Sequence, residues 1–450
     1  MFLYGGDEMK GHLKWWQLSL LGVGCIIGTG YFLGSGLAIM MTGPSAGILF
    51  ILAAIGTYIV YDSLAKMTTK DPQQGSFRTY AKKAYGRWAG FSSGWVYWVS
   101  EMLIMGSQMT ALAIFSRFWF PHIPLWMFAG GYAVLGILVV LMGTKGFDRI
   151  ENILAVVKVA AIFMFIIIAV LALSGVFHGN NSVQIPKSYD QILPKGPIGL
   201  WSAFIYAFYA FGGIEIMGIM AIQLKDKKEA PRAGRMMLLL LTVIYVVSIG
   251  LAVIMDSWRS FNTKESPFVI ALDDYHLPFF PHVFNGALIV AGFSTMVASL
   301  FSVTTMLVTL AKDGDAPKFF SIKGKTKVPL RGLGLTIYGM IISVILALLM
   351  PGKIYEYITT SAGLMLLYNW LFILFSSFKL IRLTGWVKIK NVIGILLIIL
   401  AVSGTVLEED SRPGFFGSIL FLFIIGIVVF FMRSVWKKNK NNSQEPKRTL

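Results

Sequence analysis

Long apolar runs alternate with short polar segments along almost the whole chain. Most runs reach about 18 residues or more, close to the length that a helix needs to cross the hydrocarbon core of a bilayer. The pattern predicts an all-α polytopic membrane protein with twelve transmembrane helices. We expect these spans near residues 16–40, 44–66, 88–116, 124–142, 152–176, 199–222, 236–256, 282–310, 331–350, 354–379, 391–408 and 414–433.

The first run is rich in glycine, which is unusual for a helix that must keep its backbone groups paired in lipid. Each interior glycine costs roughly 0.5–1 kcal/mol relative to alanine, so we expect the helix to break near Gly28. Unwound backbone at membrane depth is tolerated only where protein or a water-filled cavity satisfies it. A break offers N–H groups on one side and C=O groups on the other, which suit the carboxylate and the ammonium of a free amino acid.

A second break is predicted within residues 207–215, where paired glycines precede Glu215. Interrupted spans at matching places in two halves are the best sequence indication of a transporter site. The first and sixth spans match if spans one to five and six to ten form two inverted repeats, an inference that rests on spacing. The predicted division is a cytoplasmic N-terminal segment 1–15, a first repeat 16–176, a second repeat 199–379, two peripheral helices 391–433 and a basic cytoplasmic tail 434–450.

The composition places the chain in the membrane and argues against a nucleic-acid partner. It has 450 residues, of which 56% are hydrophobic and 14% charged, with a formal net charge of +17. Most Lys and Arg residues fall in the tail and in the loops on one side of the predicted spans, as the positive-inside rule requires of cytoplasmic segments. We therefore predict a multi-pass protein of the cytoplasmic membrane, with both termini in the cytoplasm and the lipid bilayer as its surroundings.

No pattern of residues predicts catalysis, a cofactor or a metal. Cys25 is the single cysteine, and the five histidines have no ligand spacing. No nucleophilic triad or catalytic pair of acids is present, so we do not expect an enzyme. Cys25 is interpreted as a small packing residue.

Several motifs occur in order along the chain. They are GCIIGTGYF at 24–32, PQQGSFRTYA at 72–81 with GWVYW at 94–98, VKV at 157–159, FGGIE at 211–215, and SPFV at 266–269 with LAKDGDAPK at 310–318. Together they resemble the amino acid–polyamine–organocation transporter superfamily, and in particular its bacterial amino acid permeases. The resemblance implies ten helices in two inverted repeats plus two peripheral helices, with alternating access to a site at the midplane.

The resemblance also implies a substrate site at the two breaks. Carried over by position, the backbone of Gly28, Thr29 and Gly30 would hold the substrate carboxylate. The carbonyls of Ile26 and of the second break, near Gly212, would accept hydrogen bonds from the ammonium.

Aromatic residues of the second break complete this implied site. The Tyr209 carbonyl would also face the ammonium, and the ring of Tyr209 or Phe211 would close over the substrate as a lid. With Ile26 and Ile27 nearby, these rings predict an apolar pocket for the substrate side chain.

Ionisable groups within spans are expensive, so their default interpretation is functional. Lys158 of the fifth span would lie near the carbonyls of the first break, where sodium-coupled relatives hold the ion; it would couple transport to protons, or stand in permanently for sodium. The alternative is a side chain that reaches to the headgroups. Glu215 would bridge helices or relay a proton, or be a structural acid. Glu101 and Gln108 are expected to share one helix face. Glu101 is interpreted first as a structural acid that faces the interior, and recognition of a cationic substrate is the alternative.

We therefore predict a permease that imports a neutral, preferably hydrophobic, amino acid by proton symport with alternating access. A sodium-independent amino acid exchanger is the first alternative. An amino acid sensor that binds without transporting is the alternative from another class. The oligomeric state is left open.

Overall fold

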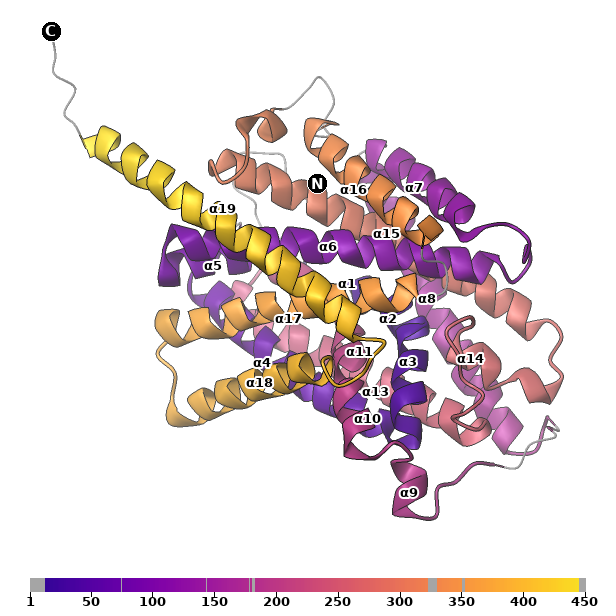
Figure 1. The fold of residues 1–450 in the computed structure, drawn as a ribbon. Coiled ribbons are helices and arrows are strands. Elements are labelled where there is room, and N and C mark those ends of the chain that lie inside the picture. The colour runs from indigo at the N-terminus through magenta and orange to yellow at the C-terminus, as the bar shows by residue number, and fades with distance from the viewer. Residues whose placement is uncertain are drawn as a thin grey trace, which may run out of the picture.

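The computed structural model describes residues 13–73, 75–142, 144–177, 179, 183–322, 330–349 and 353–444. Within these ranges the chain is helical, and its only β pairing is an isolated parallel bridge between Leu13 and Leu224 (Figure 1). In this bridge the Leu13 N–H donates to the Gln223 carbonyl at 3.0 Å, and the Lys225 N–H donates to the Leu13 carbonyl at 2.9 Å. Residues 1–12 of the predicted N-terminal segment, and 445–450 of the predicted tail, lie outside the described residues.

The helices follow the predicted apolar runs closely. They are α1 (Trp15–Ile26), α2 (Thr29–Phe32), α3 (Gly34–Thr42), α4 (Ala46–Lys70), α5 (Ser76–Tyr85), α6 (Arg87–Ser116), α7 (Leu125–Leu141), α8 (Thr144–Leu173), α9 (Tyr189–Ile192), α10 (Gly196–Ser202), α11 (Phe204–Tyr209), α12 (Ile214–Met220), α13 (Ala230–Met255), α14 (Pro267–Ile270), α15 (Phe280–Lys312), α16 (Leu330–Leu349), α17 (Ile354–Leu380), α18 (Gly385–Gly404) and α19 (Arg412–Gln444). Short 3₁₀ turns lie at Gly43–Ser45, Ala221–Gln223, Lys227–Glu229, Asp273–Tyr275 and Lys318–Ser321.

The described residues contain nine helical segments that are long and apolar enough to cross a membrane. Three shorter apolar helices accompany them, at Trp15–Ile26, Leu125–Leu141 and Leu330–Leu346. The chain is therefore an all-helical polytopic protein. The exact number of spans and the inverted repeat stay predictions.

Two helices extend beyond their predicted limits. Helix α8 begins at Thr144, eight residues before the predicted span 152–176, and α19 continues to Gln444 through most of the predicted tail. The cause is local, because polarity alone does not end a helix. No proline interrupts either extension, and Lys is a good helix former.

The helices differ in how deeply they are buried, which distinguishes central helices of the bundle from peripheral ones. In the most apolar part of α6, 89% of the residues are buried, whereas the figure is 17% in α19. In Figure 1, α6 crosses the bundle and α19 lies diagonally along its outside. Side chains of α6 are therefore well placed to line an interior site.

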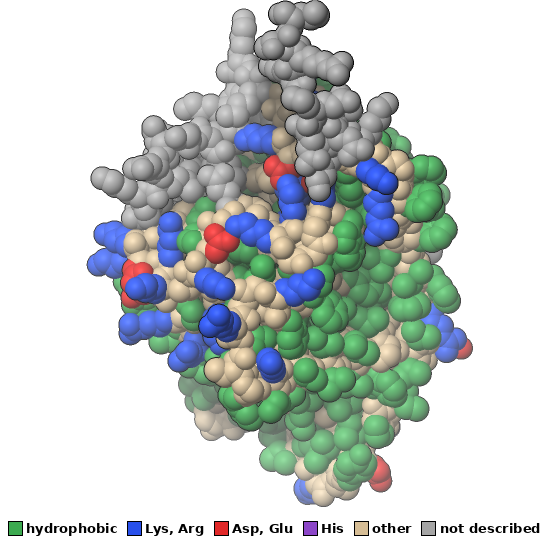
Figure 2. Space-filling model, turned by 90° about the vertical axis from the view of Figure 1, so that its left-hand side faces the viewer, with side chains coloured by type: hydrophobic (Ala, Val, Ile, Leu, Met, Phe, Trp, Pro, Cys, Tyr) green, Lys and Arg blue, Asp and Glu red, His purple; other side chains and the backbone are tan. Residues whose placement is uncertain are grey.

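Basic side chains gather at one end of the molecule. Figure 2 shows them on the end that faces left in Figure 1, with hydrophobic side chains on the flank beside it. The segments at this end include α5 and the connection between α17 and α18, whereas α9 and α14 lie towards the other end (Figure 1). Which end faces the cytoplasm stays a prediction.

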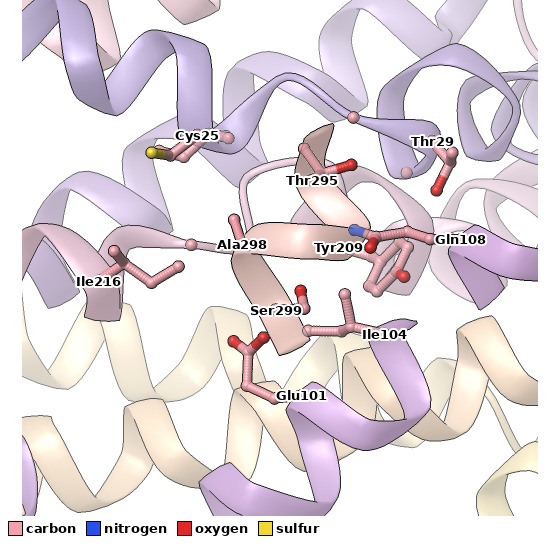
Figure 3. A pocket seen from close by; sticks show the side chains of 15 residues that line it. Cys25, Thr29, Glu101, Ile104, Gln108, Tyr209, Ile216, Thr295, Ala298 and Ser299 are labelled. Carbon is pink, nitrogen blue, oxygen red and sulfur yellow. The ribbon is translucent and has the colours of Figure 1, made fainter. Parts of the chain in front are cut away.

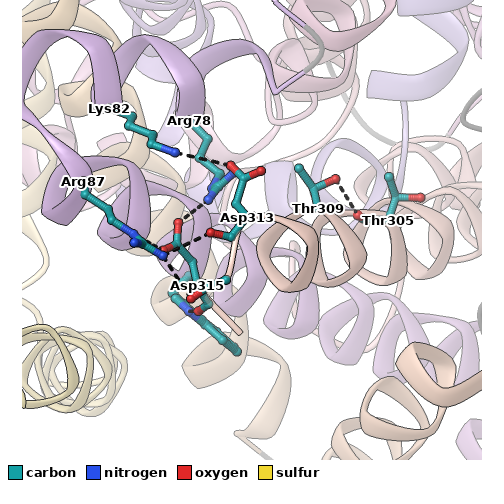
Figure 4. A network of polar contacts seen from close by, with 9 residues as sticks. Arg78, Lys82, Arg87, Thr305, Thr309, Asp313 and Asp315 are labelled. Atoms are coloured by element: carbon teal, nitrogen blue, oxygen red, sulfur yellow. Dashed lines mark hydrogen bonds and ion pairs between the residues drawn. The ribbon is translucent and has the colours of Figure 1, made fainter. Parts of the chain in front are cut away.

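A network of ion pairs fastens α5 and the start of α6 to the segment after α15 (Figure 4). Arg78 is buried and binds both Asp313, at 2.7 Å, and Asp315. Asp315 also binds Arg87 at 2.8 Å, and Lys82 approaches Asp313 to 3.7 Å. Because two carboxylates surround the buried guanidinium, its charge is compensated in an interior where an unpaired charge is costly.

Candidate functional site

The first break lies where the glycines predict it. Helix α1 ends at Ile26, Gly28 is extended with φ −153° and ψ −161°, and α2 begins at Thr29. A Cβ on Gly28 would lie 2.9 Å from side-chain atoms of Thr295 of α15. Glycine is therefore required here for the close approach of another helix, which brings the broken backbone next to α15.

The second break separates α11, which ends at Tyr209, from α12, which begins at Ile214. Gly213 has φ +114°, a left-handed conformation that side chains with a Cβ rarely adopt. The Ala210 carbonyl accepts from the Tyr245 hydroxyl at 3.0 Å, and the Tyr209 carbonyl accepts from the Gly212 N–H at 3.0 Å. Neighbouring protein thus satisfies part of the unwound backbone, as it must at membrane depth.

The two breaks meet at one pocket (Figure 3). Backbone and side chains from α1, α2, α6, α11, α12 and α15 enclose it. Its lining residues are Cys25, Ile26, Gly28, Thr29, Gly30, Glu101, Ile104, Gln108, Tyr209, Gly212, Gly213, Ile216, Thr295, Ala298 and Ser299. Of the predicted substrate residues, the lining includes Ile26, Gly28, Thr29, Gly30, Tyr209 and Gly212.

The Tyr209 ring is held in position at the pocket. Its hydroxyl hydrogen-bonds to Ser107 of α6 at 2.5 Å. A Cβ on Gly30 would lie 2.9 Å from the Tyr209 ring, so the ring lies directly against the first break. This is the place expected of an aromatic lid.

Phe211 does not line the pocket, contrary to its predicted place as an alternative lid. Its ring is buried and lies 5.1 Å from that of Tyr245 and 6.4 Å from that of Phe50. The chain turns between Ala210 and Gly213, and this turn directs the Phe211 ring towards α4 and α13 rather than towards α6. Ile27, also expected near the substrate, is buried outside the lining.

Lys158 lies beside the first break without lining the pocket. Its side chain is fully buried, and Nζ donates to the Gly24 carbonyl at 2.9 Å. The ammonium is therefore near the carbonyls of the first break, where the sequence places it, and does not extend to the headgroups.

Glu215 is attached to the second break. Oε2 accepts from the Gly213 N–H at 3.2 Å, and Oε1 accepts from Trp370 Nε1 of α17. The carboxyl group thus bridges the left-handed residue of the break and a neighbouring helix. It lies outside the pocket lining, so any role in transport would act through Gly213.

Sequence reasoning missed the contribution of α15. Thr295 and Ser299 are four residues apart and face the pocket together. Small polar residues at this spacing in an apolar run are a possible signal, although such residues also serve ordinary helix packing. Glu101 and Gln108, expected to share one face of their helix, both line the pocket. Cys25, interpreted as a packing residue, also lines it, although in Figure 3 its sulfur points away from the centre.

No group of three or more His, Cys, Asp or Glu residues that could hold a metal occurs within the described part of the chain. Lys158 hydrogen-bonds to backbone beside the first break, and Glu215 hydrogen-bonds to backbone of the second. The chemistry that the pocket offers is hydrogen bonding and charge recognition of a small polar molecule.

A bundle of apolar helices with two interruptions at one buried pocket defines a multi-pass membrane protein with a candidate small-molecule site. The family model described as "Amino acid permease" matches residues 17–443. The chain therefore belongs to the amino acid permease family, within the amino acid–polyamine–organocation superfamily, as its motifs indicate. Members of this family are transporters.

Similar proteins agree with this assignment. The chain is 53% identical over 98% of both chains to the uncharacterized transporter YcgH of Bacillus subtilis. It is 29% identical to the uncharacterized amino acid permease YvbW of the same species, over 81% of this chain and 82% of that one. It is 27% identical to the aromatic amino acid transport protein AroP of Escherichia coli, over 97% of this chain and 98% of that one.

Proposed function

We propose that the protein is a secondary active transporter that imports a free neutral amino acid across the cell membrane by proton symport. The observation that carries this proposal is the meeting of two interrupted helices at one pocket. Such a site suits alternating access, in which one repeat moves against the other around a fixed site. We extend the proposal to twelve spans, to inverted repeats at 16–176 and 199–379, to peripheral helices at 391–433, and to cytoplasmic termini.

The broken backbone would hold the ends of the amino acid. Thr29 and Gly30 open α2, and the first N–H groups of a helix have no partner within it. With Gly28 they form the proposed carboxylate site. The Ile26 and Gly212 carbonyls, which close the other side of the breaks, form the proposed ammonium site.

The Tyr209 ring supplies the proposed lid. Because its hydroxyl is bonded to Ser107 of α6, opening the lid breaks or shifts that bond. Movement of α11 relative to α6 would therefore release the substrate.

Coupling is assigned to Lys158. A charged Nζ holds the Gly24 carbonyl, and loss of the proton removes much of that attraction. Protonation at Nζ would thus change the stability of the first break in one access state. Glu215 is proposed to take part at the second break, where it holds the Gly213 N–H.

The proposal is tested by uptake into proteoliposomes. Purified protein is reconstituted, and accumulation of a panel of radiolabelled amino acids is measured with and without an inward proton gradient. We expect accumulation above the external concentration only with the gradient. Uptake that ignores the gradient but rises with internal amino acid would identify an exchanger, and binding without uptake would identify a sensor.

The Lys158→Ala variant tests the coupling residue. We expect it to lose gradient-driven accumulation while keeping substrate binding. Lys195→Ala, which changes an exposed lysine before α10, is the matched control and should accumulate substrate normally. Normal accumulation by Lys158→Ala would remove the assignment.

A further inference from the structure

One face of α6 carries polar side chains that take no part in the proposed carboxylate and ammonium sites. Glu101, Ile104 and Gln108 are spaced so that all three face the same side of the helix, and all three line the pocket. Figure 3 shows the Glu101 carboxylate on the side of the pocket opposite Cys25 and Thr29, which flank the first break. A substrate whose charged ends lie at the breaks would direct its side chain towards this face.

Hydrogen-bonding capacity at this face is left unused within the described residues. Glu101 and Gln108 are 2% and 6% exposed, yet Glu101 Oε2 and Gln108 Oε1 have no hydrogen-bond partner there. Thr29 Oγ1, which is fully buried, shares this condition. By contrast, Tyr209 bonds to Ser107, and Thr295 Oγ1 donates to the Gly292 carbonyl at 3.0 Å.

Buried polar atoms without partners are rare, because each loses its bonds to water and gains nothing. Here two acceptor atoms on one helix face lie at the edge of the same cavity. A carboxyl group keeps an acceptor oxygen in either protonation state, and an amide oxygen is an acceptor always. A donor group on a bound molecule would therefore satisfy both acceptor atoms.

We propose that the transported amino acid carries an N–H or O–H donor on its side chain, which Glu101 and Gln108 bind. This inference rests on the proposed function and names its substrate class. An amide, a hydroxyl or an ammonium group would each supply the donor. The hydrophobic preference indicated by the sequence relied partly on Ile27 and Phe211, and neither lines the pocket.

Isosteric pairs of amino acids test the proposal directly. Affinity is measured as competition with uptake by the reconstituted protein, for asparagine against leucine, threonine against valine, and lysine against 2-aminoheptanoic acid. We expect the donor-bearing member of at least one pair to bind about 5- to 150-fold more tightly, the equivalent of ~1–3 kcal/mol for one buried group left unpaired. Equal or tighter binding of the apolar member in every pair overturns the proposal.

The pairs also distinguish the possible donors. Preference in the asparagine or threonine pair identifies a neutral polar substrate. Preference confined to the lysine pair identifies a cationic substrate and would replace the neutral one in the proposed function. Transport of apolar amino acids alone would refute this inference and leave the proposed transporter intact. Absence of transport and binding for every amino acid would refute the proposed function itself.

Variants of the α6 face provide a second measurement. Gln108→Leu should reduce the preference within the favoured pair towards parity without weakening the apolar member. Glu101→Gln should weaken a cationic substrate strongly and a neutral one little, because an amide cannot ionise to pair with a cation but keeps an acceptor oxygen. Ile114→Val, on the same helix but outside the pocket lining, is the control and should leave the ratio unchanged. A ratio that neither polar variant alters contradicts the assignment.

Discussion

Replacing Gly28 by alanine is expected to block the pocket from inside. The backbone there is extended, a conformation that alanine adopts without strain. The added methyl group, however, would lie 2.9 Å from both Cγ2 and Oγ1 of Thr295, whereas ordinary contact begins at 3.4 Å. Thr295 must therefore move by roughly half an ångström, and overpacking of this kind typically costs ~1–3 kcal/mol.

The cost should be visible in binding as well as in stability, because Thr295 itself lines the pocket. If the displaced side chain takes the space of the substrate, the whole cost falls on binding and weakens it by about 5- to 150-fold. Uptake competition gives the affinity, and thermal unfolding in detergent gives the stability of the unliganded protein.

A double-mutant cycle separates this steric cause from general damage. Thr295→Ala removes the two atoms nearest to the new methyl group and leaves Thr295 Cβ at 3.2 Å, so it should restore most of the binding lost in Gly28→Ala. Gly47→Ala is the control, because nothing lies within 4 Å of a Cβ at that position. Normal binding by Gly28→Ala, or no recovery in the double variant, would show that the close approach does not shape the pocket.

Three further variants are expected to differ in stability, measured by thermal unfolding of the detergent-solubilised protein, and uptake is measured as well for the last. Asp315→Asn should destabilise it by about 3 kcal/mol, because the buried Arg78 loses one of its carboxylate partners; a melting temperature equal to wild type would contradict this. Asp71→Asn should change stability by less than about 1 kcal/mol, since Asp71 and Lys83 are both half-exposed. The hydrogen bond from Lys83 lowers the pKa of Asp71 below its ordinary 3.8. The small contribution of this pair to stability should therefore persist above pH 4 and disappear as the pH falls through the lowered pKa. A stability difference between wild type and variant that is lost between pH 5 and 8 would refute this pH dependence. Gly213→Ala should lower both stability and uptake, because φ +114° is strained for alanine at a cost of about 1–3 kcal/mol, and unchanged uptake would show that the second break tolerates another conformation.

The breaks were predictable because their cause is local. Glycine weakens a helix wherever it occurs, and glycines clustered inside a membrane span mark the weakest point from the sequence alone. The position of Lys158 near the first break followed from the family pattern and agrees with its bond to the Gly24 carbonyl.

Other parts of the site depend on packing that the sequence does not display. The direction of the Phe211 ring is set by the turn that ends at the left-handed Gly213. Tyr209, two residues earlier, lines the pocket, whereas Phe211 is buried away from it. The role of α15 could not be read either, since Thr295 and Ser299 resemble the small polar residues that any buried helix uses for packing. Their contribution becomes evident only when α15 lies against Gly28.

The pairing of Leu13 with Leu224 joins the segment before α1 to the segment after α12 through two backbone hydrogen bonds. One segment leads into α1, and the other follows α12. The two backbone hydrogen bonds therefore couple α1 and α12, so these two helices are expected to move together rather than independently. A force applied at either end, by a fusion, an antibody or a docking protein, would therefore be transmitted to both breaks together.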